Sequence, residues 1–253
     1  MIRVVGGWVV LLLTAPRLAG AQDSAVVKWN RTVEASANLL YGAAAGRVGA
    51  LTASVNRADS VLEIRTEVRF SYADARDNDG ETSVTARASR IALAIDRHPF
   101  SLFSPFAFGS LESSLQQRIA QRYAAGAGAK LTIIPPGDNE TSVSLAMLWE
   151  QTEALHPAVG VDPSATRARW SVRVRANRRL TSTLTMSHLT LWQPVADDLG
   201  QYTTETRTGL VIKVNSSLSL TATVRDKYDS EAIARGSASN HDGQVLFGLL
   251  AKF

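Results

Sequence analysis

Residues 61–72 read VLEIRTEVRFSY, and the alternation in this stretch decides the fold. From residue 62 onward the even-numbered side chains are Leu, Ile, Thr, Val, Phe and Tyr, whereas the odd-numbered ones are Glu, Arg, Glu, Arg and Ser. Successive side chains of a β-strand point to opposite faces, so this pattern predicts a strand with one largely apolar and one charged face. The same alternation recurs at residues 33–41, 169–177, 207–215 and 218–225.

The rest of the chain is expected to consist of strands as well. Only residues 111–122 carry a helix-like pattern, and the glutamines and serines there also suit a strand end followed by a loop. The alternation and the turn residues between segments predict about twelve strands. They are expected at residues 28–42, 47–57, 61–74, 81–95, 101–113, 120–134, 140–152, 167–179, 183–193, 202–215, 218–230 and 242–253.

Two all-β architectures fit strands with one apolar and one charged face. In an exported soluble β-sandwich, acting as a binding protein, the apolar faces pack in a dry core and the polar faces meet water. In an outer-membrane barrel the apolar face meets lipid and the polar face lines a lumen. Soluble strands usually run about 5 or 6 residues, whereas several segments here alternate for ten or more. Strand length therefore favours the barrel.

The connections between the expected strands differ in length in a regular way. Short turns at one end and longer loops at the other are typical of outer-membrane barrels, whose two termini lie on the periplasmic side. We therefore predict an all-β, transmembrane, antiparallel up-and-down β-barrel of about 12 strands. The short connections are residues 57–60, 96–100, 135–139, 180–182 and 216–217, and the long ones are residues 155–166, 194–201 and 231–241.

The first 21 residues have the pattern of a signal peptide. Arg3 supplies the positive start, residues 4–13 are largely apolar, and Ala19-Gly20-Ala21 matches the small-residue cleavage site. The apolar run is too short for a transmembrane anchor, which needs about 20 residues. We therefore predict cleavage after Ala21, a barrel domain over residues 22–253, and export to the outer membrane of a Gram-negative-type bacterium.

The composition of the 253 residues excludes several classes of protein. There is no cysteine, which rules out a disulfide scaffold and a thiolate zinc site. A hydrophobic content of 45% is too high for a disordered chain. The formal net charge of +4 is too small over this length to indicate a nucleic-acid-binding protein.

The last ten residues alternate again, and the chain ends on Phe253. This segment resembles the closing strand of outer-membrane proteins, whose terminal aromatic residue is read by the barrel-assembly machinery. Phe253 is therefore the expected barrel-assembly signal. The partners that this implies are outer-membrane lipid and, during insertion, the assembly machinery.

A wider resemblance covers nearly the whole mature chain. The first hairpin from Trp29, residues 123–129 (YAAGAGA), residues 225–231 (RDKYDSE) and the closing strand together resemble the salt-induced outer membrane protein family, a domain of unknown function. The most specific piece is the run KYDSE at residues 227–231. The resemblance implies an outer-membrane barrel and a link to salt or osmotic stress. It implies no catalytic residues.

The charged strand faces hold the functional candidates. Two interpretations compete: the charges pair across strands and with Glu34 and Glu205 so that side chains fill the barrel, or the basic excess lines a narrow pore that favours anions. The first is favoured because small barrels tend to be filled. The lumen-lining candidates are Glu63, Arg65, Glu67, Arg69, Arg169, Arg173, Arg175, Arg207, Lys213 and Arg225.

The sequence does not favour an enzyme. The alternative is an outer-membrane lipid hydrolase of the phospholipase type, because His188 and Thr190 have the spacing of a base and a hydroxyl nucleophile. Threonine is a weak substitute for serine, and no orienting partner is identifiable. The remaining histidines lack metal-ligand spacing. We therefore expect no catalytic residues, no metal and no cofactor.

Overall fold

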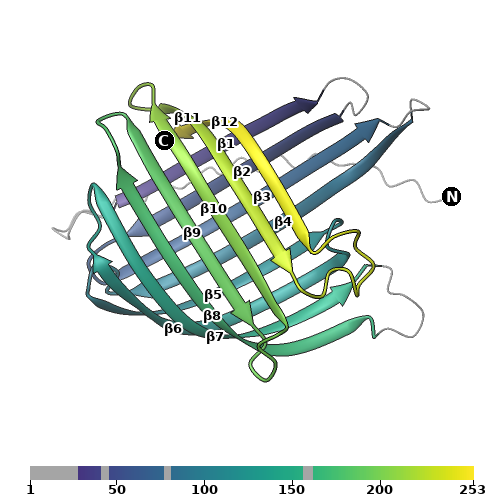
Figure 1. The fold of residues 1–253 in the computed structure, drawn as a ribbon. Helices are drawn as coiled ribbons and strands as arrows, with labels where there is room; N and C mark the ends of the chain where they lie inside the picture. The colour runs from purple at the N-terminus through teal and green to yellow at the C-terminus, as the bar shows by residue number, and fades with distance from the viewer. Residues whose placement is uncertain (1–27, 41–45, 77–80, 156–161) are drawn as a thin grey trace, which may run out of the picture.

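The computed structural model describes residues 28–40, 46–76, 81–155 and 162–253, and in them the regular secondary structure is entirely β (Figure 1). The expected signal peptide at residues 1–21 lies outside the described residues. The described residues contain no helix long and apolar enough to cross a membrane. The strands are β1 (Lys28–Leu40), β2 (Gly46–Ala58), β3 (Leu62–Arg76), β4 (Thr82–Arg97), β5 (Phe103–Ser114), β6 (Ile119–Ile134), β7 (Asn139–Ala154), β8 (Ser164–Arg179), β9 (Leu184–Pro194), β10 (Tyr202–Lys213), β11 (Leu218–Asp229) and β12 (His241–Lys252).

The twelve strands form one closed barrel. Each strand pairs antiparallel with its neighbours in the sequence, and β1 pairs with β12 to close the ring. The backbone N–H of Phe253 continues this seam by donating to the carbonyl of Arg31 at 3.0 Å. The predicted antiparallel barrel of about 12 strands is confirmed, with strand ends within three residues of those expected. The alternative of two packed sheets is wrong, because a single sheet closes on itself.

The helix-like stretch at residues 111–122 belongs to a strand, a turn and a second strand. β5 ends at Ser114, the backbone N–H of Arg118 donates to the carbonyl of Leu115 at 3.2 Å, and β6 begins at Ile119. Glu112 and Arg122 are paired across the two strands. Cross-strand pairing therefore prevails over the weak helical pattern.

The barrel has polar side chains inside and apolar side chains outside. Arg69 on β3 lies opposite Arg90 on β4, while their neighbours Phe70 and Ile91 are exposed on the outer surface. Among the described residues, 22 polar or charged side chains are buried against 8 hydrophobic ones. A water-soluble protein shows the opposite distribution. The apolar face is therefore the outer wall, and the charged face lines the lumen.

The two ends of the barrel differ. One end, called here the terminus end, carries Lys28, Lys252 and the short turns that follow the even-numbered strands. In three of these turns, at Asp59, Thr181 and Asn215, a side chain accepts two backbone N–H groups. Asp59 Oδ1 accepts those of Val61 (2.9 Å) and Leu62 (2.8 Å). These two hydrogen bonds, that from Leu62 first, hold the pKa of Asp59 below its usual value. Asn215 accepts two backbone N–H groups in the same way before β11.

The opposite end, called here the loop end, carries the connections between odd- and even-numbered strands. The longest described connection runs through residues 230–240, between β11 and β12, and residues 195–201 join β9 to β10. Two of the three long connections predicted from the sequence are therefore found at this end, whereas the connection between β5 and β6, residues 115–118, is as short as the turns at the terminus end.

Close backbone approach at two places requires glycine. A Cβ added to Gly126 would lie 2.5 Å from the carbonyl oxygen of Met147, and one added to Gly128 or Gly248 would meet neighbouring backbone more closely still. Gly126 and Gly128 are on β6 and Gly248 is on β12, which lie on opposite sides of the barrel. Glycines inside strands commonly mark tight bends at barrel corners. These glycines allow neighbouring backbone to approach closely on two opposite sides of the barrel.

Candidate functional site

The ten lumen-lining candidates all occupy inward-facing strand positions. Nine of them line internal cavities, and the tenth, Lys213, is exposed at the terminus end of β10. The cavity at the terminus end takes Glu63, Arg65, Arg173 and Arg175; a cavity toward β1, β11 and β12 takes Glu67, Arg69, Arg207 and Arg225; and a cavity at the loop end takes Arg169.

Glu205 on β10 forms ion pairs with three arginines in the lumen. Its carboxylate lies 3.4 Å from Arg69 on β3, 3.1 Å from Arg90 on β4 and 3.2 Å from Arg225 on β11. It is 6% exposed. Since β4 and β10 lie six strands apart in a ring of twelve, the contact with Arg90 spans the lumen from wall to wall.

Further ion pairs cross the lumen beside Glu205. Lys227 on β11 binds Glu112 on β5, again from opposite sides of the ring. Arg122 on β6 lies 2.9 Å from the fully buried Asp229 at the end of β11. Arg90 also reaches Glu112, at 4.0 Å. We refer to Arg69, Arg90, Glu112, Arg122, Glu205, Arg225, Lys227 and Asp229 as the cross-lumen network.

The sequence predicted only part of this network. It named Arg69 and Arg225 as lumen-lining, and the interpretation in which charges pair across the barrel included Glu205 and Glu34. Glu205 forms such pairs, whereas Glu34 forms no ion pair with a described residue. Glu112 was missed because it falls in the helix-like stretch, and Lys227 and Asp229 were noted only as part of the family resemblance. Glu112, Lys227 and Asp229 all occupy lumen-facing positions of their strands, so the alternation of faces along β5 and β11 could have identified them.

The connection between β11 and β12 covers the loop end of the lumen. Arg235 Nη2 lies 2.5 Å from Asp229 Oδ2, and Arg235 Nε donates to the carbonyl of Gln117 at 3.2 Å. Ser237 Oγ donates to the carbonyl of Gln116 at 2.5 Å. Residues 116 and 117 belong to the turn between β5 and β6, on the far side of the ring from β11 and β12. Residues 230–240 therefore form a mouth cap.

The mouth cap is also attached to β8. Glu231 lies 2.7 Å from Arg167 and 3.6 Å from Arg169. Arg169 is 1% exposed and its Nε donates to Glu150 Oε1 on β7 at 3.0 Å. Charged contacts thus hold the cap to two different parts of the rim.

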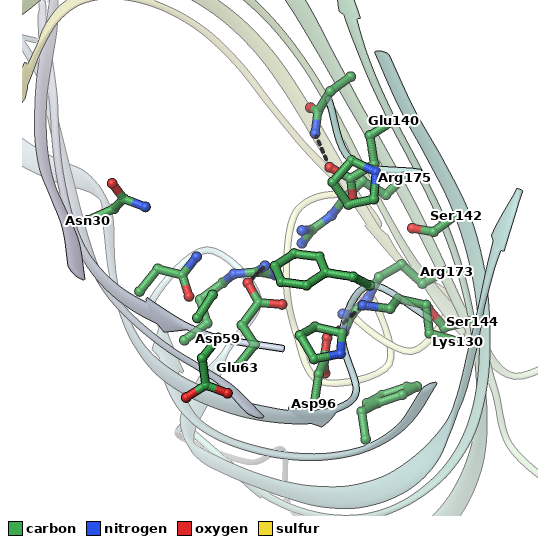
Figure 2. A pocket seen from close by; sticks show the side chains of 18 of the residues that line it. Asn30, Asp59, Glu63, Asp96, Lys130, Glu140, Ser142, Ser144, Arg173 and Arg175 are labelled. Carbon is green, nitrogen blue, oxygen red and sulfur yellow. Dashed lines mark hydrogen bonds and ion pairs between the residues drawn. The ribbon is translucent and has the colours of Figure 1, made fainter. Parts of the chain in front are cut away.

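Cavities remain on both sides of the cross-lumen network. One of about 580 Å³ opens at the terminus end, and we call it the terminal chamber (Figure 2). A second cavity of about 250 Å³ lies toward β1, β11 and β12. Within the network the described space falls to cavities of about 110 Å³ and 50 Å³. The cavities in the network and the cavity of about 130 Å³ at the loop end are therefore all smaller than the terminal chamber.

The terminal chamber has two arginines that stand apart. Arg173 and Arg175 on β8 line it together with Lys130, Asp96 and Glu140, as Figure 2 shows. The guanidinium of Arg173 lies 6.0 Å from the centre of each of two aromatic rings, Phe106 and Phe108. These contacts are in the range of cation–π interactions.

His188 and Thr190, the candidates for lipid hydrolysis, face the outside of the barrel. His188 Nε2 lies 2.9 Å from Thr190 Oγ1, and Nδ1 lies 2.9 Å from Thr208 Oγ1 on β10. The base and the hydroxyl are thus in contact, but the group on the other ring nitrogen is a neutral hydroxyl. It cannot balance the charge of an imidazolium as the carboxylate of a catalytic triad does. Among the described residues no cluster of His, Asp and Glu could hold a metal ion.

Comparisons with known proteins give a family and a fold. A family model described as "Protein of unknown function, DUF481" matches residues 49–253. None of the curated proteins matches the chain. Among solved structures, the chain is similar to a KdgM porin with 12% sequence identity and a TM-score of 0.47, over 88% of this chain and 99% of that chain. It is similar to the NanC porin with 7% identity and a TM-score of 0.48, over 88% and 98%. An anion-selective porin from Comamonas acidovorans matches with 10% identity and a TM-score of 0.41, over 90% and 99%. These likenesses concern the barrel fold alone.

Proposed function

We propose that this chain, which belongs to the DUF481 family, is an outer-membrane β-barrel whose charged lumen is closed to solute flow in the conformation described. The description of the family states no function. Its role in the envelope is that of a filled structural barrel, and a narrow pore would form only if the cross-lumen network opened. The observation that carries this proposal is the contact of Glu205 with arginines from both walls of the lumen.

The outer surface supports placement in a bilayer. The described strands contain 11 to 16 residues, and a tilted strand needs about 9–11 to cross. Apolar side chains such as Leu93, Leu145 and Phe247 are 43%, 54% and 59% exposed. In water this surface would cause aggregation, whereas in lipid it is the expected barrel exterior. By the usual orientation of such barrels, the terminus end faces the periplasm.

The content of the lumen supports a closed state. A conducting pore needs a continuous water path, but the cross-lumen network places ion-paired side chains across the section and the mouth cap covers one end. These blocking groups are charged and hydrogen-bonded. Separating the partners of a buried ion pair leaves unpaired buried charges, which is costly, so the pairs resist opening and hold the lumen closed.

Placement can be tested by fractionation. The mature protein should be recovered with the outer membrane, require detergent for extraction, and migrate differently on a gel before and after heating, as folded barrels do. A mature protein that stays in the aqueous fraction would contradict the proposal.

Closure can be tested separately by recording current across planar bilayers. The unchanged barrel should give no steady current, and the double variant Glu112→Gln with Glu205→Gln should conduct, because it removes two of the three carboxylates that pair across the lumen. Glu34→Gln, which changes a lumen carboxylate without ion pairs to described residues, is the control and should stay closed. Steady ohmic conductance of the unchanged barrel would refute closure.

The link to salt or osmotic stress and the role of Phe253 in assembly are further parts of this proposal. A strain without the protein should grow more slowly at high salt and recover when the gene is restored. Phe253→Ser should slow insertion by the assembly machinery while leaving the folded barrel stable. Equal growth of the two strains, or equal insertion rates, would remove the corresponding part.

A further inference from the structure

The arginines on the lumen face of β8 change from paired to unpaired along the strand. Toward the loop end, Arg167 lies 2.7 Å from Glu231, and Arg169 lies 3.0 Å from Glu150. Nearer the terminus end, Arg173 and Arg175 form no ion pair and no hydrogen bond with any described residue. Structural pairing therefore accounts for the first two arginines and leaves the other two unexplained.

The strand register explains why these two arginines lack partners. Arg173 lies between Ser144 on β7 and Leu191 on β9, and Arg175 lies between Ser142 and Leu189. None of these four neighbours can neutralise a guanidinium. A buried or partly buried charge is costly without a partner, so two adjacent unpaired arginines form a site of surplus positive charge.

The four acids that line the terminal chamber reduce this surplus without removing it, because three of them, Asp59, Glu63 and Asp96, lie in ion-pair contact with Arg57, Arg65 and Lys130. Arg65, which comes from β3 and is close enough to repel Arg175, is itself 2.6 Å from Glu63. Lys130 lies 3.0 Å from Asp96. Glu140, on the same wall, attracts Arg175 without lying in ion-pair contact with it, and accepts a hydrogen bond from Asn177 at 3.2 Å.

The surroundings of Arg173 and Arg175 suit an anion with an organic body. The rings of Phe106 and Phe108 are within cation–π range of Arg173 and restrict where its guanidinium can point. Ser142 and Ser144 line the chamber beside the two arginines and offer hydroxyl donors. The volume of about 580 Å³ falls in the range of small-molecule sites.

We propose that Arg173 and Arg175 form a binding site in the terminal chamber for a small organic anion that carries a carboxylate or phosphate group. The planar guanidinium groups match the oxygen geometry of either group and bind it through charge-assisted hydrogen bonds. The anion enters from the terminus end, where the chamber is bounded by the turns at Asp59, Phe100 and Pro136. The site requires no flow through the barrel, so it stands whether or not the lumen conducts.

Calorimetric titration of the folded barrel in zwitterionic detergent tests the site. The probes are glucose 6-phosphate, glucuronate and glucose, which share one ring and differ in the charged group. We expect at least one of the two anions to bind and neutral glucose not to bind. Comparison of the two anions identifies which charged group the arginines prefer. Equal binding of glucose, or no binding of either anion, would overturn the proposal.

Variants assign the binding to the two arginines. Arg173→Gln and Arg175→Gln should each weaken anion binding roughly ten- to a hundredfold, as expected for the loss of a charge-assisted hydrogen bond. Lys213→Gln removes an exposed cation of the same barrel outside the described cavities and should change nothing. Heat-modifiable migration of each variant confirms that it is folded. Unchanged binding in the folded double arginine variant would refute the assignment, whatever the current recordings give.

Discussion

Replacing Glu205 by Gln keeps the size of the side chain and removes the charge that three arginines share. Arg69 retains Glu67 at 2.8 Å, and Arg90 retains Glu112 at 4.0 Å. Arg225 retains no described carboxylate within ion-pair distance. Breaking a buried pair costs about 3–5 kcal/mol, because the remaining charge stays buried without a partner. With one arginine of three left fully unpaired, we expect Glu205→Gln to lower the free energy of unfolding by about 3 kcal/mol.

Urea unfolding of the barrel in lipid vesicles, followed by the fluorescence of the four tryptophans in residues 22–253, measures this change. With slopes of about 1–3 kcal/mol per molar urea, the midpoint should fall by about 1 M or more. Glu34→Gln makes the same chemical change in the same lumen at a carboxylate without ion pairs to described residues, and should cost less than about 1 kcal/mol. If the two variants unfold at the same urea concentration, the cross-lumen network does not stabilise the barrel and the reasoning fails.

Four other predictions follow from the outer wall, the strands and the turns. Leu93→Arg puts a charge on the lipid face and should lower vesicle-based stability by about 2–4 kcal/mol near the bilayer centre; no loss would argue against a bilayer location. Gly128→Ala brings a methyl group against neighbouring backbone and should lower the free energy of unfolding by about 1–3 kcal/mol in the same assay. Gly137→Ala, where no atom lies within 4 Å of the added methyl group, should leave it unchanged. Asp59→Asn should be less stable than the parent at pH 7, and the difference should vanish as the pH falls below 3.8 through the lowered pKa of Asp59, because the parent then also becomes neutral. His188→Ala should leave phospholipid acyl release at the level of the parent barrel, and a drop would revive the lipid-hydrolase alternative.

The strand content could be predicted from the sequence because each strand has a different environment on each side. In β3 the alternation of Glu63, Arg65, Glu67 and Arg69 with apolar residues follows from a lipid face and a lumen face, and both leave a period-two signal. The pairing of β1 with β12 could also be predicted, because an even number of antiparallel strands can close into a ring and closure leaves no unpaired sheet edge.

The contacts inside the lumen could not be predicted in the same way. Parity places Arg173 and Arg169 on one face of β8, but it cannot say that Glu150 and Glu231 reach Arg169 while Arg173 has no acid. That difference depends on the register between strands and on where residues 230–240 fold. The local alternation of side chains predicts neither the register nor the position of residues 230–240, because each depends on contacts between residues far apart in the chain.

Glu205 also has a consequence for how the sequence can change over generations. Its carboxylate joins Arg69, 136 positions earlier in the chain, and Arg225, 20 positions later. A substitution that removes the carboxylate of Glu205 leaves unpaired arginines on both walls of the lumen. A substitution that removes one of these arginines changes the charge balance around Glu205 and the remaining arginines. Substitutions at these distant positions should therefore be accepted together or in quick succession. In a collection of homologues they should form a covarying group, even though no two of them are neighbours in the sequence.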